Sequence, residues 1–230
     1  TLKLSPDAQV LLTVGRLVQR KGHVLAIDAV ASLAQKYPNL HYLIVGRGAE
    51  ETHIRTRIAK HHLEQRIHVL NNVEDTNTVY AAADLFVFPS FEGKRGDVEG
   101  FGLVSVEAQA HGLPVIASNT GGIPETINPG ITGELVEPGE ADEIAKAIEP
   151  FLKDPFRLQR YSDRARKFAK EQFSWETRRK RIAELLQHVT TVPKVKVSVV
   201  IPAFNSAKTL ATTLNGLNAQ TLKPNEIVVV

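Results

Sequence analysis

Two carboxylates, Glu99 and Glu107, lie eight positions apart across a glycine-rich turn. The pattern predicts Glu99 in a loop and Glu107 about one turn into a helix that begins at Leu103. Gly100 and Gly102 allow close approach to the backbone, and the free N–H groups at a helix start attract phosphate. A carboxylate behind such an anion site can accept hydrogen bonds from two adjacent hydroxyls, as a ribose presents them. The segment therefore predicts a site for a phosphorylated, hydroxyl-bearing ligand.

The helix that carries Glu107 is expected to place it on an otherwise apolar face, formed by Leu103, Val104 and Ala108. A single buried Glu is typical of a core carboxylate whose hydrogen bonds are all made within the protein. The combination of Glu99, the glycine turn and Glu107 favours a binding site instead. A second glycine turn, Gly121-Gly122 followed by Ile-Pro-Glu, comes after the next predicted strand. We expect it to add backbone groups to the same edge.

Two cations follow the first predicted strand, in Gly15-Arg16-Leu17 and then Lys21-Gly22. Arg16 offers a planar fork suited to phosphate oxygens, and Lys21 offers a point charge. Taken alone, this spacing is more typical of a solvated turn before a helix. The segment 45–48 (Val-Gly-Arg-Gly) resembles a dinucleotide-binding turn, but its third glycine position holds Glu51, so a tight turn is the favoured interpretation.

These loops need a scaffold, and the first 150 residues alternate short apolar runs with helical patterns. Unalternating Val, Ile and Leu runs separated by helices indicate an α/β protein with a doubly wound, Rossmann-like parallel sheet. Ligands bind beyond the carboxyl ends of such strands. The expected strands are 10–14, 42–45, 67–70, 85–88 and 114–117. The expected helices are 24–35, a polar stretch that follows 42–45 and runs to about 62, and then 78–83, 103–110, 141–152, 155–173 and 175–188.

The chain changes character near residue 190. We expect a first domain at 1–189, a linker at 190–195 and a separate strand–helix–strand unit at 196–230, with strands at 196–203 and 226–230 around a helix at 207–217. That last unit is too short to bury a core alone. A chain that begins at Thr1, contains no Met and ends within an apolar strand is expected to be cut from a longer protein.

Composition excludes several classes of protein. Hydrophobic residues make up 43% and charged residues 23%, which is typical of a soluble globular protein. The absence of Cys excludes a disulfide scaffold and any thiolate metal site, and no apolar run reaches the roughly 18 residues of a membrane span.

Charge is distributed unevenly. The net charge is +3, but the stretch between Arg157 and Arg181 holds ten basic and three acidic residues, a net of +7, which leaves −4 for the rest. A +3 chain does not indicate a nucleic-acid partner. Two interpretations of the basic stretch stay open: a solvent-exposed pair of helices that completes the fold, or a surface that binds a partner.

The string EGFGLVSVEAQAHGLPVIAS, with GRL…KG upstream and TGGIPE downstream, resembles the C-terminal, donor-binding domain of the retaining family 4 glycosyltransferases of GT-B architecture. The resemblance covers about residues 8–188. It implies a UDP- or GDP-linked sugar as ligand, with Arg16, Lys21 and Glu99 as catalytic residues. The two cations would grip the donor diphosphate, and Glu99 would address the donor sugar. The other donor-binding residues that it implies are Gly15, Gly100, Phe101, Gly102, Leu103 and the ribose-binding Glu107.

One segment departs from the family pattern. Residues 91–98 are longer and more charged than the usual two or three residues at this place. Lys94 or Arg95 would be able to touch the donor or an acidic acceptor, although a mobile surface loop is the favoured interpretation.

No metal or other cofactor is expected. A departing nucleoside diphosphate must be neutralised by a metal or by fixed cations and dipoles. The sequence contains no Asp-x-Asp pair and no His-Glu-x-x-His motif, whereas Arg16, Lys21 and the helix start at Leu103 are present. The sequence thus predicts a metal-independent site.

Residues 196–230 resemble the opening strand–helix–strand of the family 2 glycosyltransferases of GT-A architecture. In that family the first strand and the segment corresponding to residues 202–205 line the nucleotide, and acidic motifs follow the second strand. The chain ends at Val230, before those motifs, so no catalytic residue of this second domain is assigned.

The resemblance implies transfer of a sugar to a saccharide or lipid-linked acceptor with retention of configuration. The expected partners are a missing N-terminal acceptor domain and an anionic membrane surface touched by the basic helices, at the cytoplasmic side of the membrane. Two alternatives stay open: a sugar-nucleotide epimerase, which shares the architecture, and a catalytically silent nucleotide-sugar-binding or scaffold module.

Overall fold

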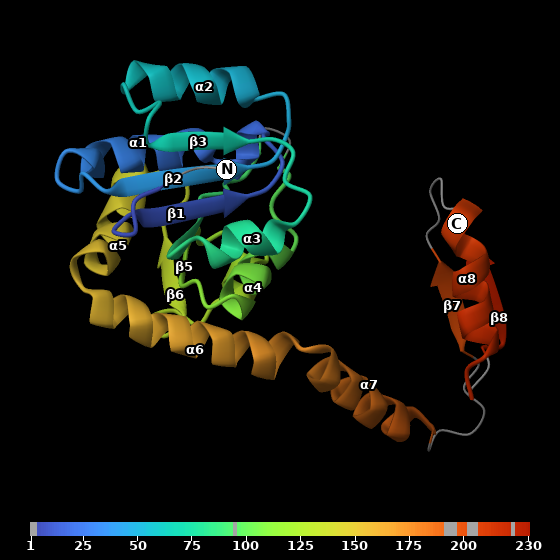
Figure 1. Ribbon diagram of the computed structural model, residues 1–230. Coiled ribbons are helices and arrows are strands. Elements are labelled where there is room, and N and C mark those ends of the chain that lie inside the picture. The colour runs from blue at the N-terminus through green and yellow to red at the C-terminus, as the bar shows by residue number, and fades with distance from the viewer. Residues whose placement is uncertain (1–3, 94–95, 191–196, 202–206, 222–223) are drawn as a thin grey trace. The chain divides into compact units, whose positions relative to one another are not determined.

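Six short strands pair side by side in one parallel sheet, in the order β3-β2-β1-β4-β5-β6 (Figure 1). The computed structural model describes residues 4–93, 96–190, 197–201, 207–221 and 224–230. The strands are β1 (Gln9–Val14), β2 (Leu40–Val45), β3 (Ile67–Leu70), β4 (Leu85–Phe88), β5 (Val115–Ser118) and β6 (Gly133–Val136). The strand order reverses direction between β1 and β4, which is where doubly wound sheets bind ligands.

Helices cover both faces of this sheet (Figure 1). Leu11 of β1 belongs to a core shared with α1, α2 and α5, whereas its neighbours Val10 and Leu12 belong to a core shared with α3 and α4. The expected α/β, doubly wound architecture is therefore confirmed. The helices are α1 (His23–Ala34), α2 (Glu51–Lys60), α3 (Thr76–Ala81), α4 (Leu103–Ala110), α5 (Ala141–Lys153) and α6 (Pro155–Phe173).

Most expected elements occur within a few residues of their predicted bounds, but β6 was not expected. This strand is an edge strand of four residues whose middle pair, Glu134 and Leu135, is only partly buried. Such a short, half-polar run lacks the apolar continuity that marks the inner strands. A second difference is α3, which begins two residues earlier than predicted because the Asp75 side chain caps it by accepting from the Asn77 N–H (3.0 Å).

The chain divides into two compact units, Thr1–Ser174 and Trp175–Val230. The second unit holds α7 (Trp175–Thr190) and the parallel strands β7 (Ser198–Ile201) and β8 (Glu226–Val229), joined through α8 (Ala207–Asn218). The strand–helix–strand pattern expected near the end of the chain is present in its described parts. Residues 202–205 and most of the expected linker lie outside the described residues.

Acidification is expected to destabilise the first unit. The His41 and His68 rings stack on neighbouring strands (centroids 5.8 Å apart), and burial lowers the pKa of each from 6.5. In this pH range the two imidazoles therefore bind protons more readily in the unfolded chain than in the folded chain. The free energy of unfolding consequently falls as pH drops from about 7 toward about 5. Urea unfolding across that range checks the slope. A His41→Gln/His68→Gln variant should flatten it, and an unchanged slope in this variant would contradict the assignment.

Candidate functional site

Lys21 is positioned by a tight backbone junction at the carboxyl edge of the sheet. It ends the short 3-10 helix η1 (Gln19–Lys21), and Gly22 follows in the left-handed region (φ 68°) before α1 begins. A Cβ atom at Gly22 would overlap the carbonyl oxygen of Pro89, just after β4. This close approach holds the Lys21 Nζ 4.9 Å from the centroid of the Phe88 ring. The glycine thus brings the segment after β1 against the segment after β4.

Lys21 and Glu99 form the centre of a charged cluster. Lys21 is only 9% exposed, and its ammonium contacts the Glu99 carboxylate. The Arg20 guanidinium also reaches Glu99 (3.1 Å), and its Nε pairs with Asp97 (3.1 Å). Burial by itself would raise the pKa of Glu99, but Lys21 and then Arg20 outweigh it and lower that pKa. Glu99 is therefore held ionised between two cations.

Arg20 is a site residue that was not predicted from the sequence. No local sequence pattern signals it, because its contact with Glu99 joins positions 79 apart. Arg16, which was predicted, has an exposed side chain, and none of the carboxylates in the described residues pairs with it. The predicted pair of cations is thus completed by a third one, which contacts Glu99 directly.

The glycines at 46 and 48 have a structural role. The Gly15 N–H donates to the Val45 carbonyl (2.9 Å), and the Leu17 N–H donates to the Arg47 carbonyl (2.8 Å). Cβ atoms at Gly46 and Gly48 would overlap the carbonyl oxygens of Gly15 and Leu17. The segment after β2 therefore supports the loop that carries Arg16, in agreement with the tight-turn interpretation.

The turn between Glu99 and α4 is built from close backbone contacts. The Gly122 N–H donates to the Glu99 carbonyl (2.9 Å), and a Cβ atom at Gly122 would overlap the carbonyl of Gly100. Gly102 is the N-cap of α4 at φ 84°, where a Cβ atom would run into the Phe88 ring. Phe101 faces another way, with its ring centroid 5.9 Å from that of Phe173. The two predicted glycine turns do lie together at one edge.

The apolar face expected around Glu107 is divided in the structure, because Ala108 is buried whereas Leu103 is exposed. Glu107 is exposed, and Leu103, one turn earlier on the same face of α4, is 62% exposed. The buried face consists of Ser105, Ala108 and Gln109 instead. The reason is polar pairing: the Gln109 amide donates to the backbone carbonyl of Thr126 (2.6 Å) in the 3-10 turn η2 (Ile123–Thr126). This network turns Glu107 outward, where a ligand can reach it.

Tyr80 orients Glu107. The Tyr80 hydroxyl, on the buried face of α3, donates to Glu107 Oε2 (2.9 Å). Burial, followed by the Glu107 charge, raises the pKa of Tyr80, so it remains a donor. No local sequence pattern signals this residue, because the contact joins two helices 27 positions apart.

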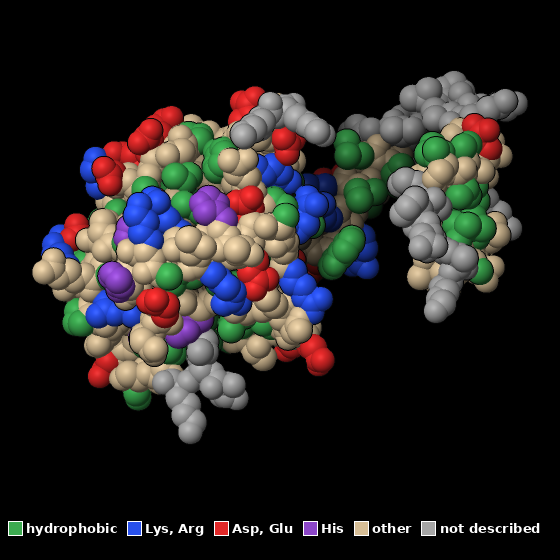
Figure 2. Space-filling model, turned by 90° about the horizontal axis from the view of Figure 1, so that it is seen from above, with side chains coloured by type: hydrophobic (Ala, Val, Ile, Leu, Met, Phe, Trp, Pro, Cys, Tyr) green, Lys and Arg blue, Asp and Glu red, His purple; other side chains and the backbone are tan. Residues whose placement is uncertain are grey.

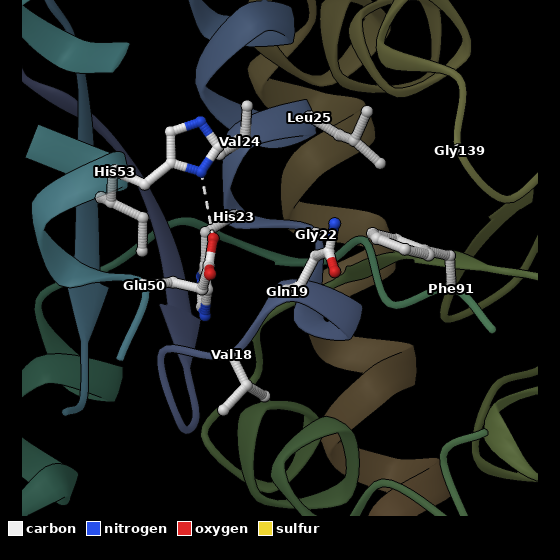
Figure 3. A pocket seen from close by; sticks show the side chains of 11 residues that line it. Val18, Gln19, Gly22, His23, Val24, Leu25, Glu50, His53, Phe91 and Gly139 are labelled. Atoms are coloured by element: carbon white, nitrogen blue, oxygen red, sulfur yellow. Dashed lines mark hydrogen bonds and ion pairs between the residues drawn. The ribbon is translucent and has the colours of Figure 1, made fainter. Parts of the chain in front are cut away.

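A cavity of about 340 Å³ opens beside η1 (Figure 3). Its walls come from η1, the starts of α1 and α2, Phe91 and Gly139. Glu50 and His53 face each other across one side, with 3.0 Å between Oε2 and Nδ1. Neither Glu99 nor Glu107 lines this cavity, so it is separate from the charged cluster.

The longer segment at 91–98 starts and ends in hydrogen-bonded structure. The Phe91 N–H donates to the Arg20 carbonyl (2.8 Å), and the Gly93 N–H donates to the Asp97 carbonyl (2.8 Å). Lys94 and Arg95 lie outside the described residues, so their expected contact with a donor or acceptor stays a prediction.

The basic stretch is divided between the two units. Six of its ten cations lie on α6, where Arg157 pairs with Glu134 (2.9 Å) and Arg166 donates to the His111 carbonyl (3.1 Å). The other four lie on α7. On the face shown in Figure 2, acidic and basic side chains of the first unit are interspersed. Among the described residues, none of the helices combines the length and apolar character that crossing a membrane requires.

Sequence comparison gives a consistent result. The family model described as "Glycosyl transferases group 1" matches residues 2–168. The GDP-mannose-dependent monoacylated α-(1-6)-phosphatidylinositol monomannoside mannosyltransferase of Corynebacterium glutamicum is 37% identical over 189 residues, which cover 81% of this chain and 49% of that protein. A GDP-mannose-dependent α-(1-6)-phosphatidylinositol monomannoside mannosyltransferase of Mycolicibacterium smegmatis is 34% identical, over 78% of this chain and 48% of its own length. The chain thus spans about half the length of these curated relatives.

Solved structures agree with this. The Anabaena protein HepE in complex with UDP superposes with a TM-score of 0.70 at 30% identity, covering 79% of this chain and 49% of that one. Sucrose-phosphate synthase from Thermosynechococcus elongatus superposes with a TM-score of 0.71 at 32% identity, covering 82% and 47% of the two chains.

Proposed function

The chain belongs to the group 1 glycosyl transferases, and on that premise we propose that it is the half of such an enzyme that binds the nucleoside diphosphate sugar. One observation carries the proposal. The buried Lys21–Glu99 pair, the glycine turn before α4 and the outward-facing Glu107 all lie at the carboxyl ends of β1 and β4. That combination offers cations for a diphosphate, backbone N–H groups for phosphate or sugar, and a carboxylate for ribose hydroxyls.

Each group has a defined task in this proposal. Lys21 and Arg16 neutralise the charge that develops on the departing diphosphate, helped by the N-terminus of α4. Glu99, kept ionised by Lys21 and Arg20, accepts hydrogen bonds from hydroxyls of the donor sugar. The sugar then passes to a saccharide or lipid-linked acceptor with retention of configuration, and a further domain supplies the acceptor site. No metal takes part.

The donor base is proposed to be uracil or guanine. The two mannosyltransferase relatives are named as GDP-mannose-dependent, and HepE was solved with UDP.

Glu107→Ala is expected to weaken binding of the preferred UDP- or GDP-sugar about 10-fold or more, because it removes the acceptor of two charge-assisted ribose hydrogen bonds. Calorimetric titration in buffer with EDTA measures the affinity and tests metal independence together. Glu64→Ala, which removes an exposed carboxylate elsewhere, is the matched control and should bind like the unmodified chain. Equal affinities for Glu107→Ala and the control would count against the ribose assignment.

The basic stretch is proposed to meet an anionic membrane at the cytoplasmic side, where a lipid-linked acceptor would lie. On α7, Arg178 and Arg179 flank an exposed apolar row formed by Trp175, Ile182 and Leu186. Apolar residues bordered by arginines are typical of helices that lie in a membrane interface.

Vesicles containing phosphatidylglycerol are therefore expected to sediment the chain, and neutral phosphatidylcholine vesicles are not. An Arg178→Gln/Arg179→Gln variant should lose most of this binding, while an Arg55→Gln/Lys60→Gln variant of α2 should keep it. Binding that the α7 variant retains, or that persists in full at about 0.5 M salt, would contradict an electrostatic contact.

Residues 196–230 are proposed to begin a second transferase domain of the GT-A type. The parallel pairing of β7 with β8 through α8 supports this, because such a unit opens an α/β domain. Two competing functions remain testable: an epimerase would convert the donor sugar without any acceptor, and a silent module would bind the nucleotide sugar without turnover in the longer protein.

A further inference from the structure

We propose that His23 is a positioning residue that ties the Arg16 loop to the Lys21 junction, so that both cations meet one diphosphate. The purpose of this link rests on the proposed function, but the contact itself is a feature of this chain. No role for His23 follows from the sequence alone.

His23 opens α1 and is only 2% exposed. Its Nε2 lies 3.1 Å from the backbone carbonyl oxygen of Arg16. A carbonyl oxygen only accepts, so Nε2 carries the proton and donates, and Nδ1 has a bare lone pair. Burial lowers the pKa of His23 more than the contact with Arg16 raises it, and the nearby Lys21 lowers it further, which favours this neutral form.

The Arg16 carbonyl receives two donors, the Val18 N–H (2.9 Å) and the His23 ring. The backbone N–H groups on either side of Arg16 donate to carbonyls at the end of β2 and just after it. His23 supplies the remaining link, which runs to α1 and through Gly22 to Lys21. Through this side chain, the loop and the junction hold a fixed spacing.

Arg16 depends on that spacing because its side chain is exposed and pairs with no carboxylate of the described residues. A flexible guanidinium binds a diphosphate more tightly when its backbone is already in place, since less freedom is lost on binding. His23 provides such preorganisation without touching the ligand.

The chemistry of the ring argues against simple core filling. His23 Nδ1 is buried without a hydrogen-bond partner among the described residues, which is costly for a polar atom. A Phe or Leu would fill the same space without that cost. His23 also borders the cavity beside η1, together with Glu50 and His53 (Figure 3). The ring is therefore best explained by its hydrogen bond to the Arg16 carbonyl.

The test compares His23→Phe, which keeps a planar ring but removes the donor, with His23→Gln, whose amide N–H can replace Nε2–H. UDP and GDP are the probes, and the tighter of the two is used for the whole series. We expect His23→Phe to weaken binding about 5- to 10-fold and His23→Gln to stay within about 3-fold of the unmodified chain, the range that one hydrogen bond supplies. In an Arg16→Ala background, His23→Phe should cause no further loss.

A second measurement does not depend on ligand. Backbone amide signals of residues 15–18 in ¹H–¹⁵N NMR spectra should shift in His23→Phe and remain near their original positions in His23→Gln. Unshifted signals in His23→Phe would overturn the proposal, whether or not a nucleotide binds. The proposal would also be overturned if the double variant lost as much affinity as the His23→Phe and Arg16→Ala losses combined. If the signals shift as expected but neither nucleotide binds the unmodified chain, the positioning contact stands and the proposed function fails.

Discussion

Replacing Lys21 by alanine is expected to weaken binding of the nucleoside diphosphate sugar by roughly 10- to 100-fold, because a hydrogen bond to a charged group contributes about 1.5–3 kcal/mol. Lys21 is the most buried cation of the cluster, and its ammonium lies between the Glu99 carboxylate and the Phe88 ring. In so enclosed a place a point charge acts on a diphosphate with little screening by water. Arg20 would remain on Glu99 but lies one residue further from the glycine junction.

Calorimetry on Lys21→Ala gives the affinity, and circular dichroism shows whether the variant is folded. Lys60→Ala removes an exposed lysine of α2 and should bind normally. Lys21→Arg is a stricter comparison, since it keeps the charge but changes its shape. If folded Lys21→Ala binds as tightly as Lys60→Ala, the cluster around Glu99 is a structural ion pair and not a donor site.

Gly22→Ala is expected to cause one of the largest losses of stability that a single added methyl group can produce in this chain. The left-handed backbone conformation costs a non-glycine residue about 1–2 kcal/mol. In addition, the new Cβ would overlap the Pro89 carbonyl oxygen, a backbone atom that cannot move without shifting the segment after β4. We expect the free energy of unfolding to fall by more than about 3 kcal/mol, in the range of severe core defects.

Gly130→Ala is a matched control for that experiment. Gly130 has a similar backbone conformation (φ 76°), but none of the described atoms beyond its chain neighbours lies within 4 Å of the place that a Cβ would take. The free energy of unfolding of Gly130→Ala should therefore fall only by the conformational cost of about 1–2 kcal/mol. Urea unfolding of both variants separates conformational strain from the clash. Equal losses would show that the approach of Gly22 to Pro89 is not what holds Lys21 in place.

The scaffold could be predicted from the sequence because the inner strands are short and almost wholly apolar. A run such as Leu85–Phe88, buried on both faces, has few alternatives to a central parallel strand. The edge strand β6 carries only a partly apolar pattern and was not predicted. The first residue of a helix was harder to predict where a capping side chain determines it, as Asp75 does for α3.

The proximity of the candidate site residues could be predicted from the sequence, but their contacts could not. Glu99, Glu107 and the glycines between them stand in one continuous string, so their proximity follows from local structure. Tyr80 and Arg20 act on these glutamates through contacts spanning 27 and 79 positions, which no local pattern contains. The polar character of the buried face of α4, through Ser105 and Gln109, was not predicted for a similar reason, because Gln109 donates to a carbonyl 17 positions away.

We propose that the carboxyl edge of the sheet binds a nucleoside diphosphate, and titrating the unmodified chain with UDP and with GDP in ¹H–¹⁵N NMR experiments tests this binding. We expect one of these nucleotides to shift the amide signals of residues 15–22 and 100–104 together, in a saturable manner and in the presence of EDTA. Shifts at residues 23–25, 50–54, 91 and 139 of the cavity beside η1 without shifts at 100–104, or no shifts with either nucleotide, would contradict this proposal.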